Sequence, residues 1–195
     1  MKKKVILTII FLAILPLITT GLTLMSIKNT QSVNSNAEAI LPNINPPYVR
    51  LVTDKNSFKV GDDIPVHILV NTGGEQTLES HFVIAFDQSV LNINPEDLQN
   101  NNIYPVKDIE TIASGKAIFS LFAKNEAGYS PISLPLELEV ATLHFHAIGS
   151  SKTTKIDLVV SQIDETTSII SSFPDPKIDE TNILRATEGV SIIIE

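Results

Sequence analysis

The chain has 195 residues, with 14 basic and 22 acidic side chains and no cysteine. The net charge of −8 argues against nucleic acid as a partner, because phosphate binding needs clustered lysine and arginine. Without cysteine, disulfide bonds and a lipid-modified N-terminal cysteine are excluded, so an apolar core alone must hold any fold.

The first 27 residues are the most apolar part of the chain. Lys2, Lys3 and Lys4 precede residues 5–27, which contain no charged side chain. As a helix this run would extend about 34 Å, enough to cross a hydrocarbon core of about 30 Å. We expect a transmembrane signal anchor at 1–27. A cleaved signal peptide is the alternative, although its apolar run would be shorter and end at a small-x-small site.

In both cases the lysines stay in the cytoplasm and the remainder is exported. The predicted location is therefore the cell membrane, with a single pass and an extracytoplasmic C-terminal domain, or secretion if the signal is cleaved. Residues 28–48 are rich in Asn, Ser and Pro and are expected to form a flexible linker. Residues 49–195 would form a domain large enough to bury about 68–70% of its surface.

Short apolar runs separated by Gly, Pro, Asn and Asp fill this domain. They lie at 49–54, 64–71, 78–86, 90–94, 116–123, 138–148, 154–161 and 189–194. The run 138–148 alternates, with Leu143 and Phe145 on one side and His144 and His146 on the other. Only 95–100 could form a helical turn. The pattern predicts an all-β fold, an antiparallel β-sandwich.

One run stops abruptly in "VIAFDQSVL" (83–91) and resumes at once. Asp87 can accept hydrogen bonds from backbone N–H groups two residues on, and Ser89 can do so more weakly. We therefore interpret Asp87 and Ser89 as the signature of a scaffold corner. An acid catalyst would need a second carboxylate and a cleft, and the sequence indicates neither.

The ordered motifs of this domain resemble cohesin domains, the receptors that dock dockerin-bearing enzymes in bacterial cellulosomes. "FDQSVLNI" (86–93) is similar to the family's Tyr/Phe-Asp-Pro-Ser-Val-Leu-Glu-Val signature, with Gln88 and Asn92 in place of Pro and Glu. The segments 60–70, 103–128, 140–149 and 188–194 resemble further family segments in the same order. The resemblance implies a jelly-roll sandwich of about nine strands, shared with several carbohydrate-binding modules. It also implies a flat sheet face that receives a dockerin helix.

Carried over by position, the resemblance places four residues on this ligand face. They are Glu79 and His81, before the corner, and Leu121 and Lys124, after Gly115. Many relatives have an acid where this chain has Lys124. The chain contains no dockerin motif of the Asp-x-Asn-x-Asp-Gly type, so the partner is expected to be another molecule.

Metal chemistry is weakly indicated. His144 and His146 project from one strand face, but zinc needs three or four ligands, and His67 or His81 would have to converge on them. Loop acids that could bind calcium match no twelve-residue calcium loop, and turn capping is their commoner use. These acids are Asp54, Asp62, Asp63, Asp175, Asp179 and Glu180. We predict no metal site and no cofactor.

The predicted function is that of a membrane-tethered cohesin-like module, not an enzyme, that docks a dockerin-type protein within polysaccharide-degrading assemblies. The sequence has no Gly-x-Ser-x-Gly elbow and no cysteine nucleophile. Carbohydrate binding is the alternative, although the chain has no Trp and its three tyrosines, Tyr48, Tyr104 and Tyr129, are scattered. A structural envelope or adhesion protein is the second alternative.

Overall fold

The computed structural model describes residues 46–125, 128–160, 166–171 and 182–195. Ile44–Glu195 form one compact unit. The expected signal anchor, and the expected linker up to residue 45, lie outside the described residues. Within the described ranges no helix is long and apolar enough to cross a membrane.

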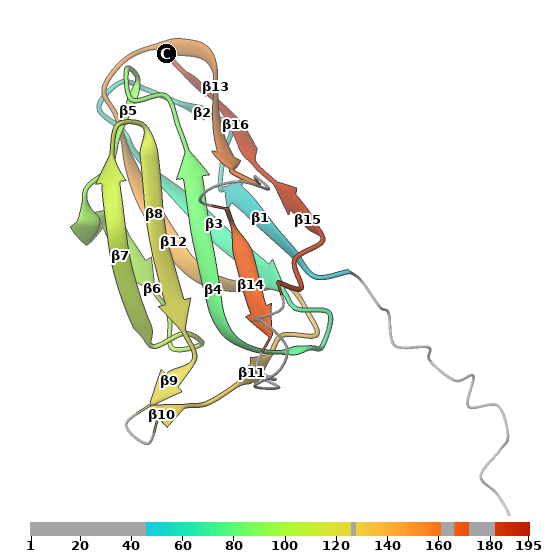
Figure 1. The fold of residues 1–195 in the computed structure, drawn as a ribbon. Helices are drawn as coiled ribbons and strands as arrows, with labels where there is room; N and C mark the ends of the chain where they lie inside the picture. The colour runs from blue at the N-terminus through green and yellow to red at the C-terminus, as the bar shows by residue number, and fades with distance from the viewer. Residues whose placement is uncertain (1–45, 126–127, 161–165, 172–181) are drawn as a thin grey trace, which may run out of the picture. The chain divides into compact units, whose positions relative to one another are not determined.

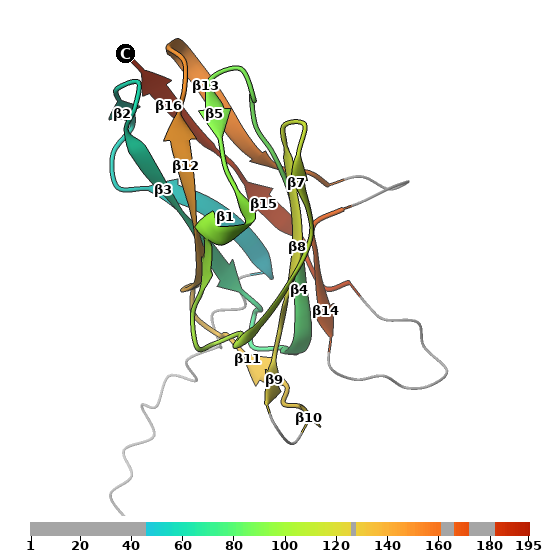
Figure 2. The ribbon, with the colours of Figure 1, turned by 90° about the vertical axis from the view of Figure 1, so that its left-hand side faces the viewer.

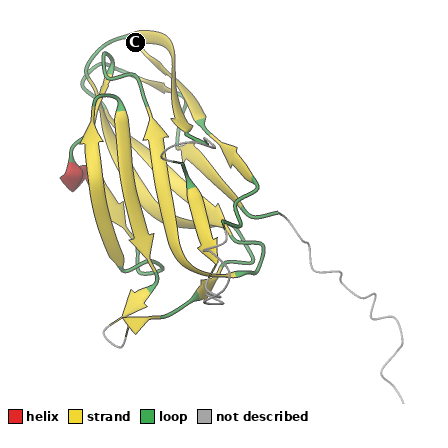
Figure 3. Cartoon of the chain, in the orientation of Figure 1, coloured by secondary structure: helices red, strands yellow, loops and turns green. Residues whose placement is uncertain are grey.

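The described part of the chain contains sixteen strand segments and one short 3-10 helix (Figures 1 and 3). They are β1 (Tyr48–Thr53), β2 (Ser57–Phe58), β3 (Asp63–Asn71), β4 (Gln76–Ala85), β5 (Leu91–Asn92), η1 (Pro95–Asp97), β6 (Leu98–Asn100), β7 (Val106–Ala113), β8 (Lys116–Phe122), β9 (Lys124–Asn125), β10 (Gly128–Tyr129), β11 (Ile132–Ser133), β12 (Leu138–Ala147), β13 (Ser151–Leu158), β14 (Ser168–Ser171), β15 (Ala186–Glu188) and β16 (Val190–Ile194). Nine of these described strands have four or more residues. The predicted all-β class is confirmed, and the helical turn expected within 95–100 is η1.

Two sheets face each other as a sandwich (Figure 2). One has the order β15-β1-β3-β12, with β5 and β6 both paired to β12; the other has the order β2-β16-β13-β4-β8-β7, with β11 and β14 paired to β4. The long neighbours β1/β3, β3/β12, β4/β8 and β7/β8 are antiparallel, whereas β1 pairs with β15 in parallel. β9 and β10 form a separate two-stranded ribbon.

The core lies between the sheets and follows the predicted alternation. Leu143 and Phe145 of β12 are fully buried, while His144 and His146 are on the outer side. In the other sheet, Phe82 of β4 and Phe119 of β8 lie directly opposite each other, and their rings stack with centroids 5.1 Å apart. Burial of such side chains, at about 25 cal/mol per Å² of apolar surface, is the main stabilising term for a chain without disulfides.

The last strand run changes sheets in the middle. β15 pairs with β1 in one sheet, and β16 pairs with β13 in the other. Gly189 joins them, and a Cβ at this position would lie 2.6 Å from the carbonyl oxygen of Ile156 and 2.4 Å from a carboxylate oxygen of Asp157. Only glycine fits this close approach, so the crossing depends on it.

A buried tyrosine fastens the inner side of β4. Tyr104 is fully buried, and its hydroxyl group lies 3.0 Å from the hydroxyl of Thr77 and 3.1 Å from that of Ser80. Burial raises the pKa of the Tyr104 phenol, and these two hydrogen bonds partly oppose the increase. The polar end of a large core side chain is thereby satisfied without water.

Candidate functional site

The corner after β4 has the hydrogen bonds that the sequence predicts. The Asp87 carboxylate accepts hydrogen bonds from the Ser89 backbone N–H at 2.9 Å and from the Ser89 hydroxyl at 2.6 Å. These bonds, the hydroxyl first, lower the pKa of Asp87. Ser89 donates its hydroxyl instead of accepting, which corrects the expected role. Both residues are exposed and serve the turn.

This corner packs on the hairpin turn between β7 and β8. Ser114 and Gly115 both have positive φ, 54° and 76°, the backbone signature of a type I′ two-residue turn. The Phe86 N–H donates to the Gly115 carbonyl at 2.9 Å, and a Cβ on residue 115 would lie 2.8 Å from the Phe86 carbonyl oxygen. The corner and the hairpin thus fix the upper ends of β4, β7 and β8 together (Figure 1).

The register of β4 and β8 decides which predicted face residues point outward. Ser80 pairs with Leu121, and His81 pairs with Ser120. Because directly opposed residues share a sheet face, Leu121 lies on the inner face with buried Ser80. Leu121 is 0% exposed, so its predicted place on the ligand face is wrong. Its neighbour Ser120 occupies the outer face instead.

On the outer face, the structure brings together Glu79, Ser120 and His81, which we call the β4–β8 polar cluster. The Ser120 hydroxyl donates to a Glu79 carboxylate oxygen at 2.7 Å. The same hydroxyl oxygen lies 3.0 Å from Nδ1 of His81. All three side chains are half-buried. Two of the four predicted face residues therefore meet, through a serine that the sequence analysis did not select.

Neighbouring strands extend the face around this cluster. On β7, Asp108 lies opposite Ser120 and is exposed, while Val106 lies opposite the half-buried Phe122 of β8. On the other side, Ser168 of β14 lies opposite His81. The face thus has a polar centre with an acidic residue on one flank and a small apolar area toward the end of β8.

Lys124, the fourth predicted face residue, lies beyond this face. It opens β9, which pairs only with β10 among the described residues, after the last pair of β4 and β8 at Glu79 and Phe122. Its backbone is therefore not part of the sheet that carries the β4–β8 polar cluster.

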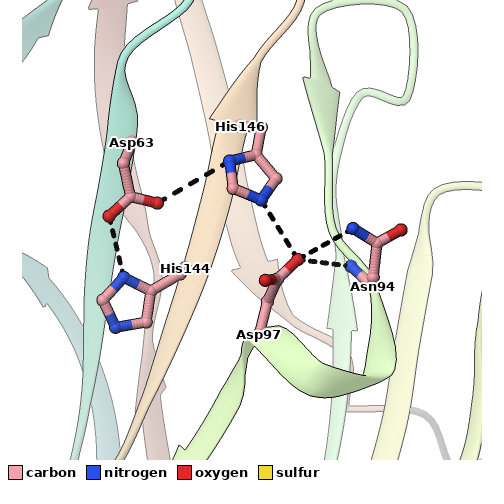
Figure 4. Close-up of polar contacts among 5 residues, drawn as sticks. All are labelled: Asp63, Asn94, Asp97, His144 and His146. Atoms are coloured by element: carbon pink, nitrogen blue, oxygen red, sulfur yellow. Dashed lines mark hydrogen bonds and ion pairs between the residues drawn. The ribbon is translucent and has the colours of Figure 1, made fainter.

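The outer face of the opposite sheet carries a second cluster, formed by Asp63, His144, His146, Asp97 and Asn94 (Figure 4). Nδ1 of His144 lies 2.8 Å from one oxygen of Asp63, and Nδ1 of His146 lies 3.8 Å from the other. Nε2 of His146 lies 3.2 Å from Asp97. Both ring nitrogens of His146 therefore face carboxylates. No three His, Asp or Glu side chains in the described ranges are arranged to hold a metal ion.

Asp97 has a structural role in this second cluster. Its carboxylate accepts from the backbone N–H of Asn94 at 2.8 Å and from the Asn94 side-chain amide at 3.0 Å. Burial tends to raise the pKa of Asp97, but these hydrogen bonds and the nearby His146 lower it below the usual value. The carboxylate reaches back over the start of η1, as in half of a capping box.

The sequence matches no model of a known protein family and no curated protein. Solved structures do match. The cohesin module of a family 33 glycoside hydrolase from Clostridium perfringens is 12% identical, with a TM-score of 0.55 over 77% of this chain and 97% of the module. A type II cohesin–X–dockerin complex from Acetivibrio cellulolyticus is 18% identical, with a TM-score of 0.54 over 76% and 99%. A non-cellulosomal cohesin from the archaeon Archaeoglobus fulgidus is 12% identical, with a TM-score of 0.50 over 76% and 91%.

The domain has the cohesin fold. The recognition made from the sequence motifs is confirmed at the level of the fold, since the matches are consistently cohesin modules. At identities of 12–18%, the likeness shows the fold and assigns no role to individual side chains on the outer faces.

The cohesin-fold domain also has a hollow of about 530 Å³ at the β15–β1 edge of the sheet that contains β3 and β12, beside Tyr48, Arg50, Glu137, Thr187 and Glu188. Glu137 accepts from both Arg50 Nε at 3.1 Å and Arg50 Nη2 at 2.5 Å, and from the Tyr48 hydroxyl at 2.8 Å. The hydrogen bonds from Arg50 come first among the causes that lower the pKa of Glu137. This bidentate pair joins β1 to the segment before β12.

The remaining candidate ligands of the cohesin-fold domain serve local structure. The Asp62 carboxylate accepts the Lys59 backbone N–H at 2.9 Å, the turn capping expected from the sequence. His67 lies 3.2 Å from Glu139 and 3.6 Å from Asp54. Asp175, Asp179 and Glu180 lie outside the described residues.

Proposed function

We propose that this chain is a docking module that binds a dockerin-type protein through the outer face of β4, β8 and β7. The β4–β8 polar cluster carries the proposal. It places hydrogen-bonding groups with fixed orientation at the centre of an open sheet face, next to apolar Val106 and Phe122. A polar group held in place by its own neighbours loses little freedom on binding.

The comparisons support this proposal at the level of fold. A solved relative from Acetivibrio cellulolyticus is a cohesin in complex with a dockerin. The Clostridium perfringens relative is a cohesin module of a glycoside hydrolase. We infer by analogy that the partner of this chain carries a dockerin-like module and works in polysaccharide breakdown.

We propose no enzymatic activity for the β4–β8 polar cluster, although it contains a serine, a histidine and a carboxylate. In a catalytic triad the histidine accepts the serine proton, and the carboxylate orients the histidine. Here the Ser120 hydroxyl donates to Glu79, so His81 does not act as its base. The order of the three groups fits recognition better than nucleophilic attack.

A binding assay with the full chain and a broad panel of dockerin modules tests the docking proposal. Ser120→Arg places a long side chain on the outer face of β8 and should weaken binding at least about tenfold, or 1.4 kcal/mol. Thr142→Arg is the matched control, because Thr142 is also half-buried but lies on the outer face of β12. Absence of binding across the panel, or equal loss in both variants, would contradict the proposal.

We further propose that residues 1–27 tether the domain to the outer side of the cell membrane. The uncharged run after three lysines supports this. The full chain should remain with membranes after an alkaline carbonate wash, whereas a variant lacking residues 5–27 should not. Recovery in the wash of a chain shortened at its N-terminus would instead favour a cleaved signal, and recovery of the uncleaved chain there would contradict the tether.

Carbohydrate binding remains the second candidate, favoured by the hollow that Tyr48, Arg50 and Glu137 line. A tyrosine ring beside a charge-compensated Arg–Glu pair suits a neutral sugar, which both packs on rings and exchanges hydrogen bonds. The buried position of Tyr104 removes it from any exposed aromatic row. Retention of the chain on an insoluble polysaccharide, lost with Tyr48→Ala, would support this candidate, and no retention on a broad set would end it.

A further inference from the structure

The hydrogen-bond order in the β4–β8 polar cluster fixes the position of a proton on His81. Ser120 has a single hydroxyl proton, and that proton is directed to Glu79 at 2.7 Å. An ionised carboxylate cannot donate, so no other assignment satisfies this contact. The hydroxyl oxygen of Ser120 can then only accept from Nδ1 of His81, which lies 3.0 Å away.

Neutral His81 must therefore carry its proton on Nδ1, because the hydrogen bond made by one ring nitrogen sets the tautomer of the other. Nε2 is left with a lone pair and no proton. Among the described residues, no hydrogen bond reaches Nε2 of His81, and the side chain is half-buried on the outer face. The sheet thus presents an acceptor of fixed identity.

Among the described side chains, the charges around this acceptor have one sign. Glu79 lies in the same cluster, and Asp108 is exposed on β7 opposite Ser120. Ser168, opposite His81 on β14, adds no charge. Lys116 pairs across from Ala85, near the other end of β4. A cation or a hydrogen-bond donor therefore fits this part of the face better than a carboxylate.

We propose, building on the docking function above, that Nε2 of His81 selects the partner. The group it takes is a hydroxyl, amide or ammonium donor on a partner segment that also carries basic side chains toward Glu79 and Asp108. Ser120 is a positioning residue. Because its proton is directed to Glu79, its oxygen accepts from Nδ1 of His81 and thereby sets the tautomer of the ring. A partner with an acceptor at this position would place its own lone pair against that of Nε2, and the repulsion would disfavour binding.

The tautomer can be measured without any partner. Ring-nitrogen chemical shifts of the ¹⁵N-labelled full chain at neutral pH should show a protonated Nδ1 and a bare Nε2 for His81. Ser120→Ala removes the acceptor of Nδ1, so the two shifts should move toward each other as the tautomers mix. A proton on Nε2 in the unmodified chain would overturn the inference while leaving the docking function untouched.

Two substitutions then separate the ring nitrogens in a binding assay with a dockerin module that the chain binds. The glutamine amide reaches the place of Nε2, whereas the asparagine amide reaches only that of Nδ1. His81→Asn should lower affinity about tenfold, the worth of one good hydrogen bond, and His81→Gln should retain most of it.

His144→Asn, on the opposite sheet, is the matched control and should change nothing. Equal affinity of His81→Asn and the unmodified chain would overturn the selecting role of Nε2. Preference for dockerin modules with acidic rather than basic facing segments would overturn it as well. If no dockerin module binds at all, the docking function itself fails, and the partner assignment fails with it.

Discussion

The two outer faces of the sandwich both carry histidines beside carboxylates, but they use them differently. On the β3–β12 face, the two ring nitrogens of His146 face Asp63 and Asp97. On the β4–β8 face, Ser120 stands between Glu79 and His81 and uses only one ring nitrogen. Because both ring nitrogens of His146 face carboxylates, neither is left to bond with a partner protein. Because Ser120 lies between Glu79 and His81, Nε2 of His81 keeps its lone pair for such a bond.

The largest expected effect tests which side of β8 is inside. Leu121→Ala should lower the free energy of unfolding by about 2–5 kcal/mol, because it empties a site in the core. Urea denaturation of the full chain measures the loss. A loss below about 0.5 kcal/mol, typical of surface positions, would mean that Leu121 points outward and that the assignment of the two faces of β8 is reversed.

The next effect tests whether the opposite face is structural. Asp97→Ala removes two hydrogen bonds to Asn94 and leaves a backbone N–H without its acceptor, at an expected cost of about 1–3 kcal/mol. Asp108→Ala, an exposed acid on the other face, serves as the control and should cost less than about 0.5 kcal/mol. Similar urea midpoints for the two variants would remove the distinction between the faces.

The dependence of stability on pH also tests the structural role of Asp97. The pKa of Asp97 is lower in the folded chain than its ordinary value, so its carboxylate favours the folded state at and above neutral pH. This contribution is lost as the pH falls from about 4 through the folded pKa. Unfolding measured from neutral pH downward should show a shallower acid decline for Asp97→Ala than for the unmodified chain. An equal decline would contradict the prediction.

The smallest effect in this series is expected at Ser120, the position where the docking proposal expects binding to weaken. Ser120→Ala should change the free energy of unfolding by less than about 1 kcal/mol, because the side chain is half-buried and Glu79 can turn to water. Urea denaturation beside the binding assay checks it. A loss as large as that of Leu121→Ala would make the β4–β8 polar cluster a structural element instead of a recognition site.

Alternation in the sequence was sufficient to predict the long central strands. β3 and β12 are flanked on both sides, so their inward residues form clean apolar rows. β7 and β14 were not expected as strands. β7 lies at the edge of its sheet and reads "VKDIETIA", in which three of the eight residues are exposed and charged, and β14 has four residues. Such strands form because they pair with another strand, and the short stretch of sequence around them does not show that pairing.

Of the residues transferred by position to a ligand face, Glu79 and His81 lie on the outer face of β4, whereas Leu121 is one residue out of phase and buried. That this outer face binds a ligand stays a prediction. A shift of one residue moves a side chain to the opposite face of a strand. The row Ala117, Phe119, Leu121 in "KAIFSLFA" already showed the inward phase, and Ser120 was the polar exception between its members. This alternation alone indicates that Leu121 points inward and Ser120 outward.

The buried hydroxyl of Tyr104 also influences how a partner binds at His81. This hydroxyl is hydrogen-bonded to Thr77 and Ser80, so the inner side of β4 is fixed before a partner contacts its outer face. Little chain entropy then remains to be lost when a complex forms. Removing a single oxygen atom, with Tyr104→Phe, should loosen the strand and speed amide hydrogen exchange along it, without altering any atom on the outside.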